Sequence, residues 1–263
     1  MLAIRTATCT QTGARDHNED DMRCGVADGA AYAVLSDGAG GHNNGAIASD
    51  LVVRLVALRL QAAADVNAAE LHAAVLEAHE LLVLQQQGVV SERQRMYATL
   101  VALWIDAQRG LALWSHVGDS RLYLLRAGRV CHVTRDDSVV QQMIDAGLID
   151  AAAAESHPMK HHLVCAMGVA GEFVAHTIER PFAVTEGDAL LLCSDGWWEA
   201  LQPIDIERTL SQAQDPEQWL QAMQALIAQA ANPKQDNHSA IAVWIGRPWS
   251  EISMTCLPGE QNA

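Results

Sequence analysis

Short apolar runs separated by turn residues open the chain. Residues 3–10, 20–27 and 30–36 form strand-like runs. Only Asp28-Gly29 separates the last two runs, and a two-residue Asp-Gly connection is a strong hairpin signal. We therefore expect an antiparallel strand pair here, with Asp28 as a turn residue and not a site residue.

Two longer stretches carry a helical period. In residues 45–64, apolar side chains recur at a spacing close to 3.6 residues. Residues 67–88 begin at Asn67, have Glu70 three positions later and end at Gly88, which is the pattern of a capped helix. Both stretches are explained by amphipathic helices that pack on a sheet.

A second strand-rich block follows, and a helix and a final strand close the pattern. Turn residues divide its apolar runs, which predicts a meander of antiparallel strands. The predicted strands are residues 98–105, 111–117, 121–127, 129–134, 174–182, 188–194 and 238–246, and the predicted helix is residues 216–231. Residues 136–166 are expected to be helical or irregular.

The order of these elements does not alternate strand with helix, as a doubly wound parallel sheet would. It predicts an α+β fold, a four-layer α-β-β-α sandwich in which two antiparallel sheets are flanked by helices. No repeat or Pro/Gly/Ser-rich linker divides the chain, so residues 1–247 form one predicted domain. Residues 248–263 are expected to be a poorly ordered tail.

Composition narrows the function classes. The chain has 17 basic and 32 acidic residues, which gives a formal net charge of -15. Such a surface repels nucleic-acid phosphates and anionic lipids, so we expect neither nucleic acid nor membrane as a partner. No apolar run reaches the ~20 residues of a membrane helix, and the N-terminus does not resemble a secretory signal. We therefore expect a cytoplasmic protein, and because no C-x-x-C pair is present, zinc is not suggested.

Four aspartates stand at the ends of apolar strands, namely Asp37, Asp119, Asp195 and Asp236. A tight turn is the ordinary role of an aspartate beside glycine. Asp37, however, begins the run DGAGGH, which leads into a helix and not into a returning strand. If the four carboxylates converge, a multivalent cation must relieve their repulsion, and oxygen ligands favour Mg²⁺ or Mn²⁺. Spacing alone leaves the turn and the metal interpretation both open.

The segment GARDHNEDD near the N-terminus adds a charged cluster. A solvated surface turn is the ordinary explanation of such a run. The alternative gives Arg15 a bidentate hold on phosphate oxygens and places Glu19 beside a metal ion.

Five segments, read in order, carry a family resemblance: RDHNED, LSDGAGGH, HVGDSRLYLLRAGRVCHVT, LLLCSDGWWEAL and KQDNHSAIAV. Together they resemble the metal-dependent Ser/Thr protein phosphatases of the type-2C class, the PPM family, and in particular its stand-alone bacterial members. The resemblance runs from about Cys9 to Ile245. It implies the same α-β-β-α sandwich, with two Mn²⁺ or Mg²⁺ ions at one edge.

The resemblance also implies roles for individual residues. The ligands of the two ions would be Asp37, which bridges them, with Gly38, Asp195, Asp236 and Glu19. Asp119 would bind a third, weaker ion, Asp20 and Asn237 would support the ligands from outside, and Arg15 would bind the phosphate. A water between the metals would attack the phosphorus in line, so no covalent intermediate is expected.

The proton donor for the leaving alcohol is open. Eukaryotic relatives have a histidine directly after the Asp-Gly pair, whereas this chain has Ala39, and His42 follows three residues later. His42 is a candidate general acid, a partner of the metal shell or a helix N-terminal residue. Asp137 stands where relatives often have a histidine, and His161 and His162 are expected to face solvent.

The resemblance implies a mobile flap at about residues 144–165 and a phosphorylated Ser/Thr protein as substrate, with a cognate Ser/Thr kinase acting on the same targets. We expect a monomer. One alternative is a catalytically weak binding module in a kinase signalling complex, which the full set of metal carboxylates disfavours. Another is a two-metal phosphohydrolase that acts on small molecules or nucleic acid.

Overall fold

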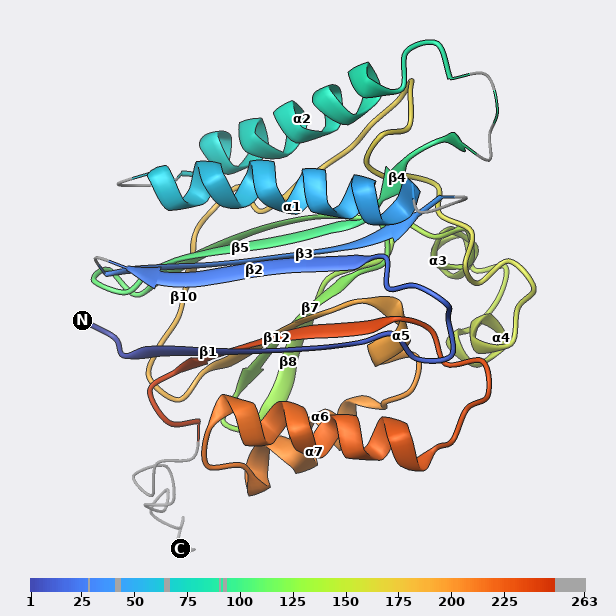
Figure 1. Cartoon of the computed structure of the whole chain (residues 1–263). Coiled ribbons are helices and arrows are strands. Elements are labelled where there is room, and N and C mark those ends of the chain that lie inside the picture. The colour runs from blue at the N-terminus through green and yellow to red at the C-terminus, as the bar shows by residue number, and fades with distance from the viewer. Residues whose placement is uncertain (28, 41–43, 64–66, 90, 92–93, 249–263) are drawn as a thin grey trace, which may run out of the picture.

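Two antiparallel sheets lie face to face, and a pair of helices covers the outer face of each (Figure 1). The computed structural model describes residues 1–27, 29–40, 44–63, 67–89, 91 and 94–248. The first sheet has the strand order β10-β6-β5-β3-β2, and the second has the order β1-β12-β11-β7-β8. The predicted four-layer α-β-β-α sandwich is therefore confirmed.

The elements have the following bounds. The strands are β1 (Ile4–Gln11), β2 (Asp20–Ala27), β3 (Ala30–Ala39), β4 (Tyr97–Ala98), β5 (Leu100–Asp106), β6 (Leu111–Val117), β7 (Arg121–Arg126), β8 (Arg129–Val133), β9 (His176–Thr177), β10 (Phe182–Ala183), β11 (Ala189–Cys193) and β12 (His238–Ile245). The helices are α1 (Asn44–Ala62), α2 (Ala68–Gln85), α3 (Val139–Asp145), α4 (Ala151–Glu155), α5 (Asp195–Trp198), α6 (Pro203–Gln212) and α7 (Pro216–Gln229).

The hairpin between β2 and β3 follows the prediction. Ala27 pairs with Ala30, so two residues connect the strands, and Gly29 adopts the positive φ of +84° that such turns require. Asp28 itself lies outside the described residues. The same register sets Asp20 opposite Asp37 at the other end of the pair, which brings two carboxylates together.

Three apolar layers hold the sandwich together, and β11 shows how one strand serves two of them. All five of its residues are buried. Leu190 and Leu192 belong to the core between the sheets, whereas Leu191 packs in the layer formed with α6 and α7. A strand buried on both faces reads as an unbroken apolar run, and this explains the sequence ALLLC.

Most predicted helices and strands are present, with four differences, the first being that the predicted strand at 98–105 is divided at Thr99 into β4 and β5. The capping box of α2 is formed, since the Glu70 amide donates to Asn67 Oδ1 at 3.0 Å and the Asn67 amide to Glu70 Oε2 at 3.2 Å. The run at 174–182 is not one strand, because it forms two short strands, β9 and β10, that each pair with β6. Pro181 lies between them and cannot donate a hydrogen bond to a strand ladder. The short α5 and the polar α6, which has Pro203 at its first turn, were not predicted.

Residues 139–162 leave the sandwich and return to it, and they contain α3 and α4. The base of this segment is closed by two backbone hydrogen bonds. The Val139 amide donates to the His162 carbonyl, and the Val164 amide to the Asp137 carbonyl, each at 2.8 Å. Most of the predicted flap lies in this segment, and Figure 1 shows α3 and α4 at the same end of the sandwich as α5.

Candidate active site

A cavity of about 1290 Å³ opens at this end of the sandwich. Residues from both sheets line it, because β3 ends here on one sheet while β11 ends and β12 begins on the other. The predicted site residues in its wall are Arg15, Glu19, Asp37, Gly38, Asp119, Asp195, Asp236 and Asn237. His42 lies outside the described residues, and Asp20 lies beside the cavity wall.

The backbone of Asp37 is fixed on both sides by Thr99, which stands between β4 and β5. The Asp37 amide donates to Thr99 Oγ1 at 2.9 Å, and the Thr99 amide donates to the Asp37 carbonyl at 2.8 Å. At the next residue, a Cβ on Gly38 would lie 2.1 Å from the Gly45 carbonyl oxygen. Gly38 is therefore needed for the start of α1 to approach β3, in addition to any role toward a ligand.

Asp20 connects the two sheets beneath the cavity. Its Oδ2 accepts a hydrogen bond from Ser194 Oγ at 2.9 Å, while its Oδ1 is buried and finds no hydrogen-bond partner in the described part of the chain. Burial raises the pKa of this carboxyl to about 7; hydrogen bonds from Ser239 and Ser194 oppose the rise, and the charge of Asp195 adds to it. The site thus holds a carboxylate whose charge is only partly compensated.

Asp37 and Asp119 lie in the same unfavourable field. Burial, followed by the charges of Asp20 and Asp195, raises the pKa of Asp37 well above its ordinary value. Burial and then Asp195 likewise raise the pKa of Asp119. Because all four strand-end aspartates line one cavity, they do converge, and the like charges demand a cation or protons.

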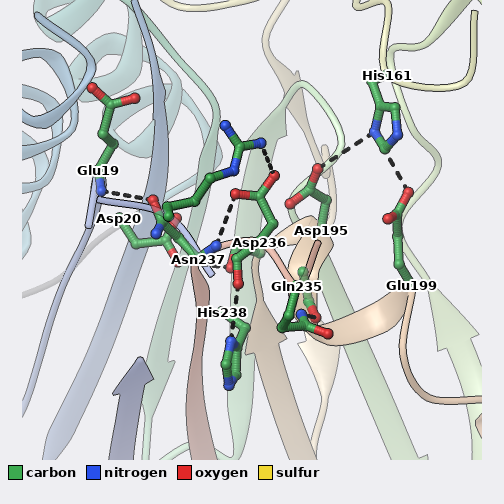
Figure 2. Close-up of polar contacts among 12 residues, drawn as sticks. Glu19, Asp20, His161, Asp195, Glu199, Gln235, Asp236, Asn237 and His238 are labelled. Atoms are coloured by element: carbon green, nitrogen blue, oxygen red, sulfur yellow. Dashed lines mark hydrogen bonds and ion pairs between the residues drawn. The ribbon is translucent and has the colours of Figure 1, made fainter. Parts of the chain in front are cut away.

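Asn237 ties the N-terminal loop to the start of β12. Its Nδ2 donates to the carbonyls of Thr12 at 2.8 Å and His17 at 2.9 Å. Its Oδ1 accepts the amide of Glu19 at 2.9 Å. This buried side chain therefore holds the backbone of Glu19, as Figure 2 shows.

Arg15 stands at the mouth of the cavity, where its side chain is 60% exposed. Its guanidinium lies 2.5 Å from Asp236 Oδ2. The other oxygen of Asp236 accepts the Asn237 amide at 2.8 Å. A planar, exposed guanidinium beside an acidic cavity is suited to an incoming phosphate.

The turn that carries Asp119 is held from two directions. Trp198 Nε1 donates to the Asp119 carbonyl at 2.9 Å. Asp137 Oδ2 accepts the amide of Gly118 at 2.9 Å, and its Oδ1 contacts His176 Nε2 at 2.8 Å. Where relatives often have a histidine, this chain has an aspartate, and a histidine from β9 pairs with it.

His161 is a residue whose position the sequence did not reveal. Its side chain is 53% exposed, as expected, but Nδ1 lies 3.8 Å from Asp195 Oδ2 and 3.5 Å from Glu199 Oε1 (Figure 2). The contact with Asp195 raises the pKa of the imidazole. Next to it, Lys160 Nζ lies 3.0 Å from Glu199 Oε1. These residues lie on the 139–162 segment, outside the five recognised motifs, so no sequence signal marked them.

The donor set fits hard divalent cations. The predicted ligands offer only oxygen atoms, and Asp195 Oδ1, like Asp20 Oδ1, is buried with no hydrogen-bond partner in the described ranges. Within those ranges, no group of three acidic, histidine or cysteine side chains is arranged so that it could hold a metal ion, and Asp236 points instead to Arg15. The carboxylates of Asp37, Asp119, Asp195 and Asp236 nevertheless line the same cavity.

Comparison with known proteins gives the family. The model of the family "Protein phosphatase 2C" matches residues 10–244. Serine/threonine protein phosphatase PstP of Mycobacterium tuberculosis is 35% identical over 222 residues, which are 82% of this chain and 40% of PstP. Serine/threonine phosphatase stp of Listeria monocytogenes is 34% identical over 215 residues, 76% of this chain and 82% of stp.

Solved structures agree with these matches. The catalytic domain of PstP, whose crystal structure is described as a complex with 2 manganese ions, superposes with a TM-score of 0.79 at 27% identity. The superposition covers 94% of this chain and 100% of that domain. With the family model matching residues 10–244, the chain belongs to the protein phosphatase 2C family of metal-dependent Ser/Thr phosphatases.

Proposed function

We propose that this chain hydrolyses phosphoserine and phosphothreonine in proteins with the help of two Mn²⁺ or Mg²⁺ ions. The observation that carries the proposal is the convergence of Asp37, Asp119, Asp195 and Asp236 at one cavity with Asp20 beside it, where burial and nearby like charges raise the pKa of Asp20, Asp37 and Asp119. The names of its relatives, which are Ser/Thr phosphatases, support the same activity. The chain spans 40% of the length of PstP, so the activity of the whole protein is part of the proposal.

The ions would be held by the carboxylates of Asp37, Asp195 and Asp236, the carbonyl of Gly38 and, through water, Glu19. Asp119 would hold a third, weaker ion. When bound, such ions supply a water activated for attack and offset the charge of the phosphoryl oxygens. The manganese in the PstP structure makes Mn²⁺ the first ion to test.

The chain's own residues bind and orient the substrate around that centre. Arg15, at the mouth, donates its two-pronged guanidinium to the phosphate oxygens. Asn237 keeps Glu19 in place, and Ser194 holds one oxygen of Asp20. Ala39 has no proton to give, so the three alternatives for His42 stay as the sequence left them.

The activity is tested with a phosphothreonine peptide and a phosphate-release assay. We expect hydrolysis that needs Mn²⁺ or Mg²⁺ and stops in EDTA. Asp37→Asn removes the bridging charge, so it should lower kcat at least 100-fold, roughly what loss of one strong electrostatic contact costs. It should also weaken Mn²⁺ binding in calorimetry. Asp50→Asn, on the exposed face of α1 and paired only with Arg23 and Arg54 within the described residues, is the matched control.

Two results would contradict the proposal. Full Mn²⁺-dependent turnover in Asp37→Asn would remove the metal assignment. Tight phosphopeptide binding by the wild-type protein, with Mn²⁺ but without turnover, would favour the binding-module alternative.

Partners and location are finer inferences. We infer a phosphorylated Ser/Thr protein as substrate, a cognate kinase that acts on the same targets, and a monomer that works in the cytoplasm. In the described residues, no helix has the length and apolar character needed to cross a bilayer.

A further inference from the structure

A second cavity, of about 470 Å³, lies between the 139–162 segment and the body of the sandwich. We call it the side cavity. One wall comes from Val140 and Ile144 of α3 and Ala154 of α4, and the opposite wall from Trp198 and Leu201. Its size falls within the range of sites that bind small molecules or side chains. No role described above uses it.

Both walls of the side cavity carry apolar side chains beside polar ones such as Gln141 and Glu155, and the basic groups in its lining already hold partners. Arg121 binds Asp136 through two hydrogen bonds of 2.8 Å, and its guanidinium stacks on Trp198 with the carbon 3.6 Å from the ring centroid. Lys160 pairs with Glu199 at 3.0 Å. The side cavity therefore presents little uncompensated positive charge, and the apolar side chains on its two walls can contact an uncharged, apolar group that loses water on entry.

The side cavity shares a border with the 1290 Å³ cavity of the candidate active site, which we call the catalytic cavity. Lys160 and Glu199 line both of them. His161 follows Lys160 and reaches from the border toward Asp195, as Figure 2 shows. If the phosphorylated residue of a substrate polypeptide lies beside Asp195, the residues next to it that extend toward the side cavity therefore pass the Lys160–Glu199 pair.

We propose that the side cavity receives a large apolar side chain of the phosphoprotein substrate, close in sequence to the phosphorylated residue. It would thus be a specificity pocket, and this inference rests on the proposed phosphatase function. The continuity of the two cavities argues for substrate as the occupant, because the same bound chain reaches both. The 139–162 segment contributes one whole wall, so it selects substrates by the shape of that wall.

The test compares phosphothreonine peptides that differ at one flanking position, leucine in one and serine in the other. Each flanking position is examined in turn, and kcat/KM is measured for both peptides. We expect the wild-type protein to prefer leucine at one or more positions by roughly tenfold or more, as hydrophobic pockets do. p-Nitrophenyl phosphate, which has no flanking residues, reports turnover independently of the pocket.

Variants then locate the preference. Ala154→Trp fills the side cavity from α4, where Ala154 is 8% exposed, and should reduce the leucine-to-serine ratio to about one. Ala152→Trp adds the same bulk on the exposed face of that helix and should keep the ratio. Ile144→Ala enlarges the side cavity without adding bulk and should lower the ratio, which covers the case in which Ala154→Trp does not fold.

Each outcome decides the matter. A wild-type enzyme that hydrolyses both peptides equally at every position refutes the pocket, as does a leucine preference that survives in both Ala154→Trp and Ile144→Ala. If neither peptides nor p-nitrophenyl phosphate are hydrolysed with Mn²⁺ present, the proposed function fails and the pocket fails with it. A preference lost in the cavity variants and kept in Ala152→Trp supports the inference.

Discussion

The substitution Asp20→Asn measures how strongly the carboxylates of the site oppose folding when no metal ion is bound. Asp20 Oδ1 is buried without a hydrogen-bond partner in the described chain, and Asp20 faces Asp37 across the β2–β3 pair. Asp20→Asn replaces the charge with a neutral group of the same shape. The amide oxygen can still accept from Ser194 Oγ, so the substitution changes mainly the electrostatics.

The sign and size of the expected change in stability follow from the pKa of Asp20. The pKa of Asp20 rises from 3.8 to about 7 on folding, so the folded state binds a proton more tightly than the unfolded state. Wild-type stability without metal therefore falls as the pH rises from about 4 to about 7 and then stays low. A rise of about three pKa units at about 1.4 kcal/mol each gives at most about 4 kcal/mol. Asp20→Asn lacks this loss and should be the more stable protein above pH 7.

Urea unfolding in EDTA, followed by circular dichroism at a series of pH values, measures the effect. The difference between variant and wild type should grow with pH through this window and level off above it. The exposed substitution Asp50→Asn should not reproduce that slope. The reasoning is refuted if the two unfolding free energies keep a constant difference from pH 4 to pH 8, or if the wild type gains on the variant.

Three further substitutions probe the supports of the site. Asn237→Ala leaves the Thr12 and His17 carbonyls and the Glu19 amide unpaired, so calorimetry should show weaker Mn²⁺ binding and urea unfolding a loss of roughly 3 kcal/mol; unchanged values would contradict the positioning role. Gly38→Ala sets a Cβ against the α1 backbone and should cost about 3 kcal/mol in thermal unfolding, a larger loss than Gly147→Ala, where no atom of the described residues lies within 4 Å of the added Cβ and only the positive φ of +68° opposes it; equal losses would count against the close approach. Arg15→Ala should raise KM for a phosphopeptide about tenfold but change stability by less than about 1 kcal/mol, since the Asp236 pair is exposed; a large stability loss would give Arg15 a structural role instead.

The architecture was predictable because the strands obey local rules. The Asp-Gly turn, the capping box at Asn67 and the continuous apolar run of β11 each indicate one structure whatever the rest of the chain does. The helix α6 was missed because its two fully buried apolar positions, Ile206 and Leu210, are too few to stand out as a period. Its stability comes from contacts with α7 and the second sheet, which no local window contains.

The site was predictable only in part, for a related reason. Strand ends showed which carboxylates could meet, and the family resemblance gave them roles. The segment 139–162 carries no such pattern, so neither His161 at the rim nor the side cavity was foreseen. Asp137 was noted as a departure, but its pairing with His176 depends on how β9 docks, and that is a tertiary property.

The pairing of β1 with β12 has a consequence for how the protein is made. Ile4 pairs with Ile245, whereas every strand from β2 to β6 is complete by Val117. On the ribosome, strands β2, β3, β5 and β6 of the first sheet can therefore assemble early with α1 and α2, while β1 waits until β12 emerges. Asp236 and Asn237 directly precede β12, so the emergence of this strand also brings the last of the proposed site residues into place. We expect stalled nascent chains that end before residue 236 to show no phosphatase activity, which ties the onset of catalysis to the emergence of β12.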